Sequence, residues 1–133
     1  MCFTICTDGE RIVRLHALKT KIITPRYEET LAYYAGLPGL ALVEQWDEPD
    51  DKGAILGFAG GAEEAFLEIY AGPAGADFGG LSLQFRTDDA DDFRAEIAGR
   101  YACEGPVDRP WGSRYLYLTD PNGIRIIVYS GGY

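Results

Sequence analysis

The same order of predicted elements occurs twice in this chain. A run of β-branched and aliphatic residues over 11–23 predicts a strand, and residues 26–36 predict a helix that Thr24 caps and Gly36 ends. Breaks rich in Gly, Pro and Asp separate the elements that follow. The first copy is completed by three shorter predicted strands, over residues 40–46, 54–59 and 65–70.

The second copy begins after a linker of small residues at 72–80. Residues 81–86 predict a strand and residues 88–100 a helix, and three further strands extend as far as Tyr129. The last two strands flank Asp120-Pro121-Asn122-Gly123, in which proline presets one turn dihedral and glycine supplies a positive φ. This pattern is typical of a β-hairpin.

Two copies of one unit indicate an α+β fold built from tandem βαβββ modules within a single domain of residues 1–133. The first module spans residues 11–71, the linker 72–80 and the second module 81–130. Each copy alone would leave one face of its sheet bare. We therefore expect the modules to pair into a curved mixed sheet around a cavity, which buries more apolar surface.

Charge and cysteine content exclude several classes of partner. Twelve Lys and Arg residues against 21 Asp and Glu give a net charge of −9, which repels a phosphate backbone, so no nucleic-acid partner is expected. The apolar runs are too short to cross a bilayer, and the N-terminal segment lacks the basic flank of a signal peptide, so no membrane partner is expected either. Three cysteines without a CxxC pair argue against a disulfide scaffold or zinc site and favour a reducing, cytoplasmic location.

Two segments carry a resemblance to a known family. Residues 23–40, with a strand, an acidic turn, a helix and Leu-Pro-Gly-Leu, and the hairpin around residues 120–123 resemble the opening and closing patterns of the vicinal oxygen chelate superfamily. This superfamily includes glyoxalases, bleomycin-resistance proteins and extradiol dioxygenases. The resemblance covers residues 12–130 and implies the paired-module fold and a homodimer. Because the family includes isomerases, dioxygenases, lyases and metal-free binders, it does not select a reaction.

The resemblance also implies where a divalent metal would be held, with two ligands from each module. Those positions fall on Lys19, Glu68, Ser82 and Ile127, of which only Glu68 is a suitable ligand. A protonated lysine has no free lone pair, isoleucine has none, and serine is a poor ligand. The sole histidine, His16, precedes Lys19 by an odd number of residues and is expected on the opposite strand face. We expect no metal and no cofactor, with the Lys19 ammonium facing Glu68 at the former metal position.

Strand alternation extends this register to the rest of the predicted cavity. Trp46 and Trp111, in or beside loops, are candidates for stacking on a flat ligand. The alternative for any of these aromatic residues is ordinary core packing. The predicted ligand-binding residues are Lys19, Lys21, Trp46, Glu68, Ser82, Gln84, Arg86, Trp111, Tyr115, Tyr117, Arg125, Ile127 and Tyr129.

An aromatic lining with a few charged groups is typical of a small-molecule pocket. We therefore expect metal-free binding of an aromatic or anionic organic ligand. The first alternative is an enzyme of the same superfamily, an isomerase, lyase or dioxygenase, that uses Lys19 and Glu68 as acid and base or a weakly bound metal. The second is a structural or regulatory protein whose cavity is filled by its own aromatic side chains.

Overall fold

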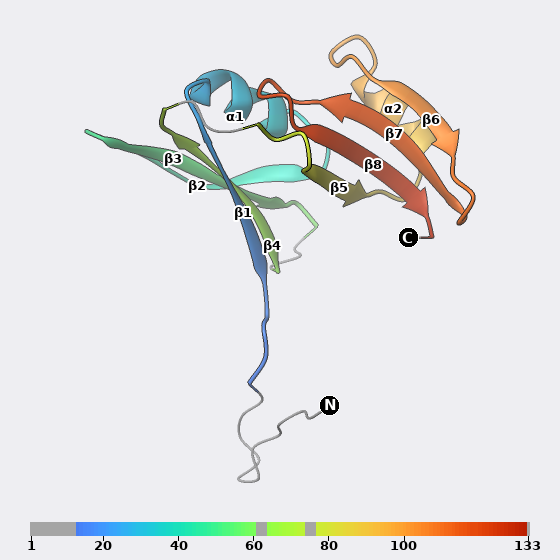
Figure 1. Ribbon diagram of the computed structural model, residues 1–133, viewed down its shortest axis with the longest axis horizontal. Coiled ribbons are helices and arrows are strands. Elements are labelled where there is room, and N and C mark those ends of the chain that lie inside the picture. Colours follow the sequence, from blue (N-terminus) through green and yellow to red (C-terminus); the bar gives the residue numbers. More distant parts are fainter. Residues whose placement is uncertain (1–12, 61–63, 74–76, 133) are drawn as a thin grey trace.

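A computed structural model describes residues 13–60, 64–73 and 77–132. The first module contains one helix and a four-stranded sheet, in which the strands lie in the order β1-β4-β3-β2 and β1 is parallel to β4 (Figure 1). Its elements are β1 (Leu18–Thr24), α1 (Tyr27–Ala35), β2 (Leu40–Glu48), β3 (Asp51–Phe58) and β4 (Ala65–Ala71).

The second module repeats this arrangement, with strand order β5-β8-β7-β6 and β5 parallel to β8. The predicted α+β class and the two βαβββ modules are confirmed. Both helices are shorter than predicted. The elements are β5 (Ser82–Arg86), α2 (Ala90–Ile97), β6 (Glu104–Asp108), β7 (Ser113–Thr119) and β8 (Arg125–Gly131).

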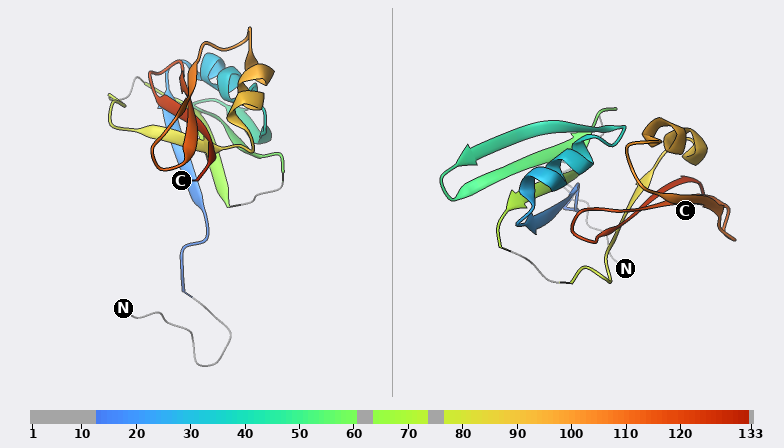
Figure 2. Two further views of the ribbon diagram at one scale, coloured as in Figure 1. Left: turned by 90° about the vertical axis from the view of Figure 1, so that its right-hand side faces the viewer. Right: turned by 90° about the horizontal axis from the view of Figure 1, so that it is seen from above.

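The two sheets are separate layers in the described part of the chain, because no strand of one sheet pairs with a strand of the other (Figure 2). The predicted single curved sheet is therefore present only as two adjacent, unclosed halves. A common apolar core nevertheless joins the modules and includes Tyr34, Leu56 and Ile69 from the first and Leu116 and Ile126 from the second.

The β7–β8 turn lies beside α1 (Figure 1) and connects the modules through side-chain hydrogen bonds. The buried Tyr34 hydroxyl donates to Asp120 Oδ2 at 2.7 Å, and Thr24 Oγ1 donates to Asn122 Oδ1 at 2.6 Å. Asn122 Nδ2 in turn donates to Thr30 Oγ1 at 3.0 Å. We call these five residues the inter-module clasp. They join β1 and α1 to a turn about 90 residues further along the chain, which a local turn signature did not predict.

Thr24 does not cap α1 as its position in the sequence suggested. The N-cap residue is Arg26, whose side chain makes no capping hydrogen bond, whereas the backbone N–H of Arg26 donates to Thr24 Oγ1 at 2.9 Å. Thr24 is the last residue of β1 and lies two positions before the N-cap, so its hydroxyl stabilises the turn and the clasp instead.

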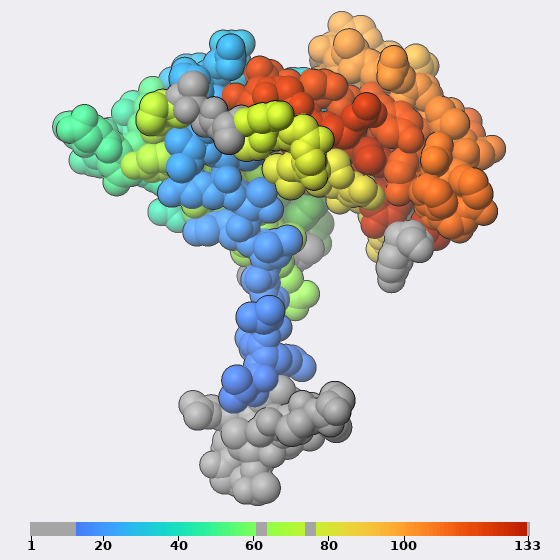
Figure 3. Space-filling model, viewed as in Figure 1, coloured from blue at the N-terminus to red at the C-terminus, as the bar shows by residue number. Residues whose placement is uncertain are grey.

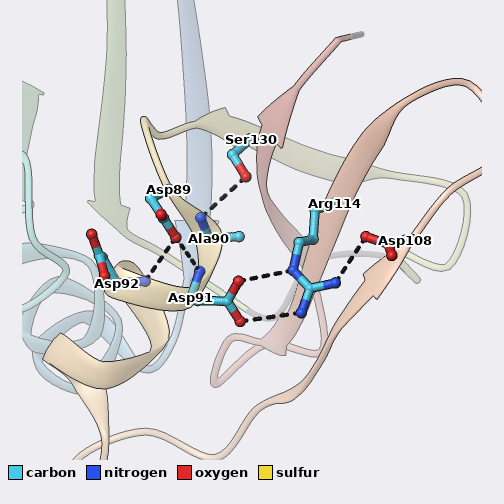
Figure 4. Close-up of polar contacts among 7 residues, drawn as sticks. All are labelled: Asp89, Ala90, Asp91, Asp92, Asp108, Arg114 and Ser130. Carbon is cyan, nitrogen blue, oxygen red and sulfur yellow. Dashed lines mark hydrogen bonds and ion pairs between the residues drawn. The ribbon is translucent and has the colours of Figure 1, made fainter.

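The start of α2 is fixed by a conventional cap and by an arginine (Figure 4). Asp89 Oδ1 accepts hydrogen bonds from the backbone N–H groups of Asp91 and Asp92, at 2.9 and 3.1 Å. The Arg114 guanidinium donates to Asp91 at 2.9 Å and to Asp108 at 2.8 Å, which ties α2 to β6 and β7.

The segment that leads into β1 stands clear of the domain (Figures 1 and 3). Residues 13–17 were predicted as part of the first strand, but β1 begins only at Leu18. Val13 and Leu15 are 75% and 97% exposed, and His16 is exposed beside them. Cys2 and Cys6 lie outside the described residues, and Cys103 is a free thiol. No helix in the described ranges is long and apolar enough to span a membrane.

Candidate functional site

Strand alternation gives the first sheet one face that packs in the core with α1 and an opposite face with charged and aromatic side chains. We call the opposite face the first open face. It consists of Lys19 and Lys21 on β1, Phe66, Glu68 and Tyr70 on β4, and Trp46 on β2.

Glu68 lies at the centre of the first open face and is 6% exposed. Its Oε1 is 3.4 Å from Lys19 Nζ and its Oε2 is 3.8 Å from Lys21 Nζ, while Lys21 Nζ also lies 4.3 Å from the centre of the Tyr70 ring. The predicted two-residue pair is thus a triad in which two half-exposed ammonium groups share one buried carboxylate. The triad leaves one positive charge in excess.

Trp46 lies flat on the same face because β3 has a glycine beneath it. A Cβ added at Gly53 would overlap the indole ring, and the indole Nε1 donates to Asp51 Oδ1 at 2.9 Å. Gly53 pairs in register with Tyr70 on one side and Trp46 on the other. The contribution of Gly53 was not predicted, since a lone glycine in a strand gives no indication of which neighbour occupies the space above it.

The second sheet has an equivalent surface, which we call the second open face. Ser82, Gln84 and Arg86 of β5 pair in register with Arg125, Ile127 and Tyr129 of β8. Across β8, Tyr117 pairs with Ile127 and Tyr115 with Tyr129. These eight residues therefore lie on one face of the second sheet, as strand alternation in the sequence predicted.

Aromatic rings on this face are in contact with one another. The Tyr115 ring centre lies 5.7 Å from Trp111, 5.9 Å from Tyr117 and 6.2 Å from Tyr129. The guanidinium carbon of Arg125 lies 5.0 Å from the centre of the Tyr117 ring, and that of Arg109 lies 5.0 Å from the centre of the Trp111 ring. Arg109 was missed by the sequence reasoning. Its place just before the Pro110-Trp111-Gly112 loop was the available signal.

Residues 14–128 match the family model of the Glyoxalase/Bleomycin resistance protein/Dioxygenase superfamily. The chain belongs to this superfamily. No curated protein sequence matches it significantly. Members of the superfamily are also found among the solved structures that resemble it.

TnmS3, an antibiotic binding protein from Streptomyces sp. CB03234, is 23% identical with a TM-score of 0.75, and the match covers 92% of this chain and all of TnmS3. A glyoxalase/bleomycin resistance protein from the same organism is 25% identical with a TM-score of 0.65, covering 83% of this chain and 96% of that protein. A bleomycin-binding protein complexed with bleomycin is 21% identical with a TM-score of 0.62, covering 86% and 98% of the two chains.

The four positions at which the resemblance predicts metal ligands are divided between the two sheets. Lys19 and Glu68 lie on the first open face, and Ser82 and Ile127 on the second. Within the described residues, no three His, Cys, Asp or Glu side chains form a group that could hold a metal ion. The donor set therefore does not fit the divalent metal of the superfamily's enzymes.

Two hollows lie between the modules, with volumes of about 310 and about 410 Å³. Both are lined mainly by apolar side chains, and Leu40, Phe58 and Phe85 contribute to both. Of the predicted ligand-binding residues, these two hollows include Ser82, Gln84 and Arg86. The structure therefore groups the predicted residues on two open faces and does not bring them into one enclosed pocket.

Proposed function

We propose that this protein binds a small organic ligand, aromatic or anionic, on its open sheet faces and without a metal ion. The observation that carries the proposal is the second open face, where Trp111, Tyr115, Tyr117 and Tyr129 present rings next to guanidinium groups. Aromatic surface with a few charged groups is the usual composition of a ligand site. The binding proteins among the structural neighbours support this kind of function.

A homodimer fits the same proposal. Val13, Leu15, Leu18, Leu42 and Val43 are all at least half exposed, and the sheet order places β1 and β5 at sheet edges. Exposed apolar side chains and unpaired strand edges favour association with a second copy. A partner chain would also cover the open faces and convert them into an enclosed site. The free thiol of Cys103 is compatible with the cytoplasmic location that we propose.

Ligand screening tests the proposal directly. A panel of planar acids, planar neutral compounds and planar bases is added to the purified protein, while thermal stability and tryptophan fluorescence are measured. Ligands that bind the folded state should raise the Tm and quench Trp111, which is 51% exposed. If no compound changes either signal, the rings serve only to pack against one another, and the binding proposal is wrong.

Two further measurements separate this proposal from turnover and from metal dependence. A bound compound should be recovered chemically unchanged after prolonged incubation, whereas an isomerase, lyase or dioxygenase would convert it. Elemental analysis of the purified protein should find no stoichiometric Fe, Mn, Ni or Zn. One equivalent of such a metal, with ligand binding lost on chelation, would contradict metal-free binding.

A further inference from the structure

Five side chains form a continuous row along the second open face, with a guanidinium group at each end. At one end, the guanidinium carbon of Arg125 lies 5.0 Å from the ring centre of Tyr117. The ring centre of Tyr115 is 5.9 Å from that of Tyr117 and 5.7 Å from that of Trp111. At the other end, the guanidinium carbon of Arg109 lies 5.0 Å from the ring centre of Trp111. We call this the aromatic row. The three rings are exposed or half-buried, so a flat molecule can reach them from solvent.

The two arginines of the aromatic row lie over aromatic rings rather than beside any carboxylate that the structure describes. Among the residues that the structure describes, neither Arg109 nor Arg125 has a carboxylate oxygen within 4.0 Å. Arg114, on the opposite face of β7, instead contacts both Asp91 and Asp108 (Figure 4). The aromatic row thus places two positive charges over rings, with no described carboxylate beside them, in a chain of net charge −9.

Arg109 also has a donor group without an acceptor in the described part of the chain. Its Nε is buried and has no hydrogen-bond partner among the described residues. Buried N–H donors are almost always paired, and guanidinium groups bind carboxylates, phosphates and other oxyanions through such donors. An oxyanion near Trp111 would supply the missing acceptor.

We propose that the aromatic row selects an elongated planar ligand with an acidic group at each end. This inference rests on the proposed small-molecule binding and names its ligand class. The rings of Trp111, Tyr115 and Tyr117 contact the body of the ligand. Arg109 and Arg125 turn from the rings to bind the two acidic groups, which exchanges a cation–π contact for a charge-assisted hydrogen bond at each end.

Three matched probes test this ligand class by calorimetric titration. They share one ring system: naphthalene-2,6-dicarboxylate, the monoacid naphthalene-2-carboxylate and the neutral naphthalene-2,6-dicarboxamide. If each acidic group gains one charge-assisted hydrogen bond, the diacid should bind about 10-fold more tightly than the monoacid and about 100-fold more tightly than the diamide. The preference for the diacid should weaken as salt concentration rises.

Arginine variants locate the effect. Arg109→Gln and Arg125→Gln should each reduce diacid affinity about 10-fold, to the level of the monoacid, while leaving diamide affinity within about two-fold. Arg94→Gln is the matched control, because it removes the same charge from α2, which packs on the other face of the sheet. Glu104→Gln removes a carboxylate that shares a surface hollow with Tyr117 and Arg125 and should strengthen diacid binding.

The outcomes separate this inference from the more general proposal. If other compounds of the panel bind but the diacid does not exceed the diamide, the aromatic row is not an acid-recognition site and only this inference is overturned. An equal loss of affinity in Arg94→Gln would overturn it as well, since the effect would then be one of net charge. If no compound binds at all, the inference fails together with the proposed function.

Discussion

Tyr34 and Asp120 form a buried hydrogen bond between the two modules, with the Tyr34 hydroxyl 2.7 Å from Asp120 Oδ2. The other oxygen of Asp120 accepts from the backbone N–H groups of Asn122 and Ile124, at 2.7 and 2.9 Å. Burial, followed by this hydrogen bond, raises the pKa of Tyr34 far above its ordinary value. The phenol therefore stays protonated, and a donor to Asp120, at neutral pH and well above it.

Removing this hydroxyl should destabilise the protein. Tyr34→Phe leaves a buried carboxylate oxygen without its main donor and should lower the free energy of unfolding by about 2 kcal/mol in urea titrations. Tyr33→Phe is the matched control, because the Tyr33 hydroxyl is buried and has no hydrogen-bond partner among the described residues. That change should leave stability within about 0.5 kcal/mol or increase it. Equal losses in the two variants would show that the clasp contributes no specific stability.

The Lys19–Glu68–Lys21 triad predicts strongly non-additive substitutions. Lys19→Met and Lys21→Met should each cost less than about 1 kcal/mol, because the remaining ammonium still compensates Glu68 and both lysines are half-exposed. The double variant leaves a buried carboxylate unpaired and should cost about 3 kcal/mol, more than the sum of the singles. Adding Glu68→Leu should recover most of that loss. Additive losses, with no recovery, would mean that the three groups do not interact.

Gly53 should control the position of the Trp46 indole. Gly53→Ala places a Cβ in the space that the indole occupies, so Trp46 should be displaced toward solvent. In a Trp111→Phe background, which leaves Trp46 as the only tryptophan, its emission should shift to longer wavelength. Gly80→Ala is the control, because no atom lies within 4 Å of the added Cβ. An unchanged emission spectrum in the Gly53 variant would show that the Trp46 indole does not occupy the space above Gly53.

The contact between Asp91 and Arg114 should appear in the pH dependence of stability. The Arg114 hydrogen bond holds the pKa of Asp91 below its ordinary value of 3.8, so the stabilisation is present above that pH and is lost as the pH falls through the lowered value. The Tm difference between the wild type and Asp91→Asn should therefore be largest above pH 4 and narrow at lower pH. Asp92→Asn is the control, because it removes the same charge one residue further along α2 and so measures the general effect of net charge on the Tm.

The sequence predicted the fold better than the site. The two-fold element order, the hairpin at Gly123 with its φ of 86°, and the division of each strand into two faces follow from local patterns, and all were predicted. The arrangement of the two sheets could not be read in this way. It depends on contacts such as those of Tyr34 with Asp120 and Thr24 with Asn122, which connect residues far apart in the chain.

The candidate site was predicted in register but not in detail. Lys19 and Glu68 lie on one sheet face, as strand alternation predicts, and their side chains form an ion pair, although the register partner of Glu68 is Lys21. Three features depend on side-chain orientations: the diagonal reach of Lys19 to Glu68, the place of Arg109 at the end of the aromatic row and that of Gly53 beneath Trp46. A one-dimensional pattern contains no information on those orientations.

The inter-module clasp makes the two similarly folded halves of the chain different from one another. Its acceptors, Asp120 and Asn122, occupy the last turn of the second module, whereas the equivalent connection in the first module, between Phe58 and Ala65, reads Ala-Gly-Gly-Ala-Glu-Glu and has neither an Asp nor an Asn. The two halves are therefore no longer interchangeable. A chain made of two first modules would lack the acceptors. A chain made of two second modules would have Ile97 at the position of the Tyr34 donor, because the helices of the two modules begin at Tyr27 and Ala90.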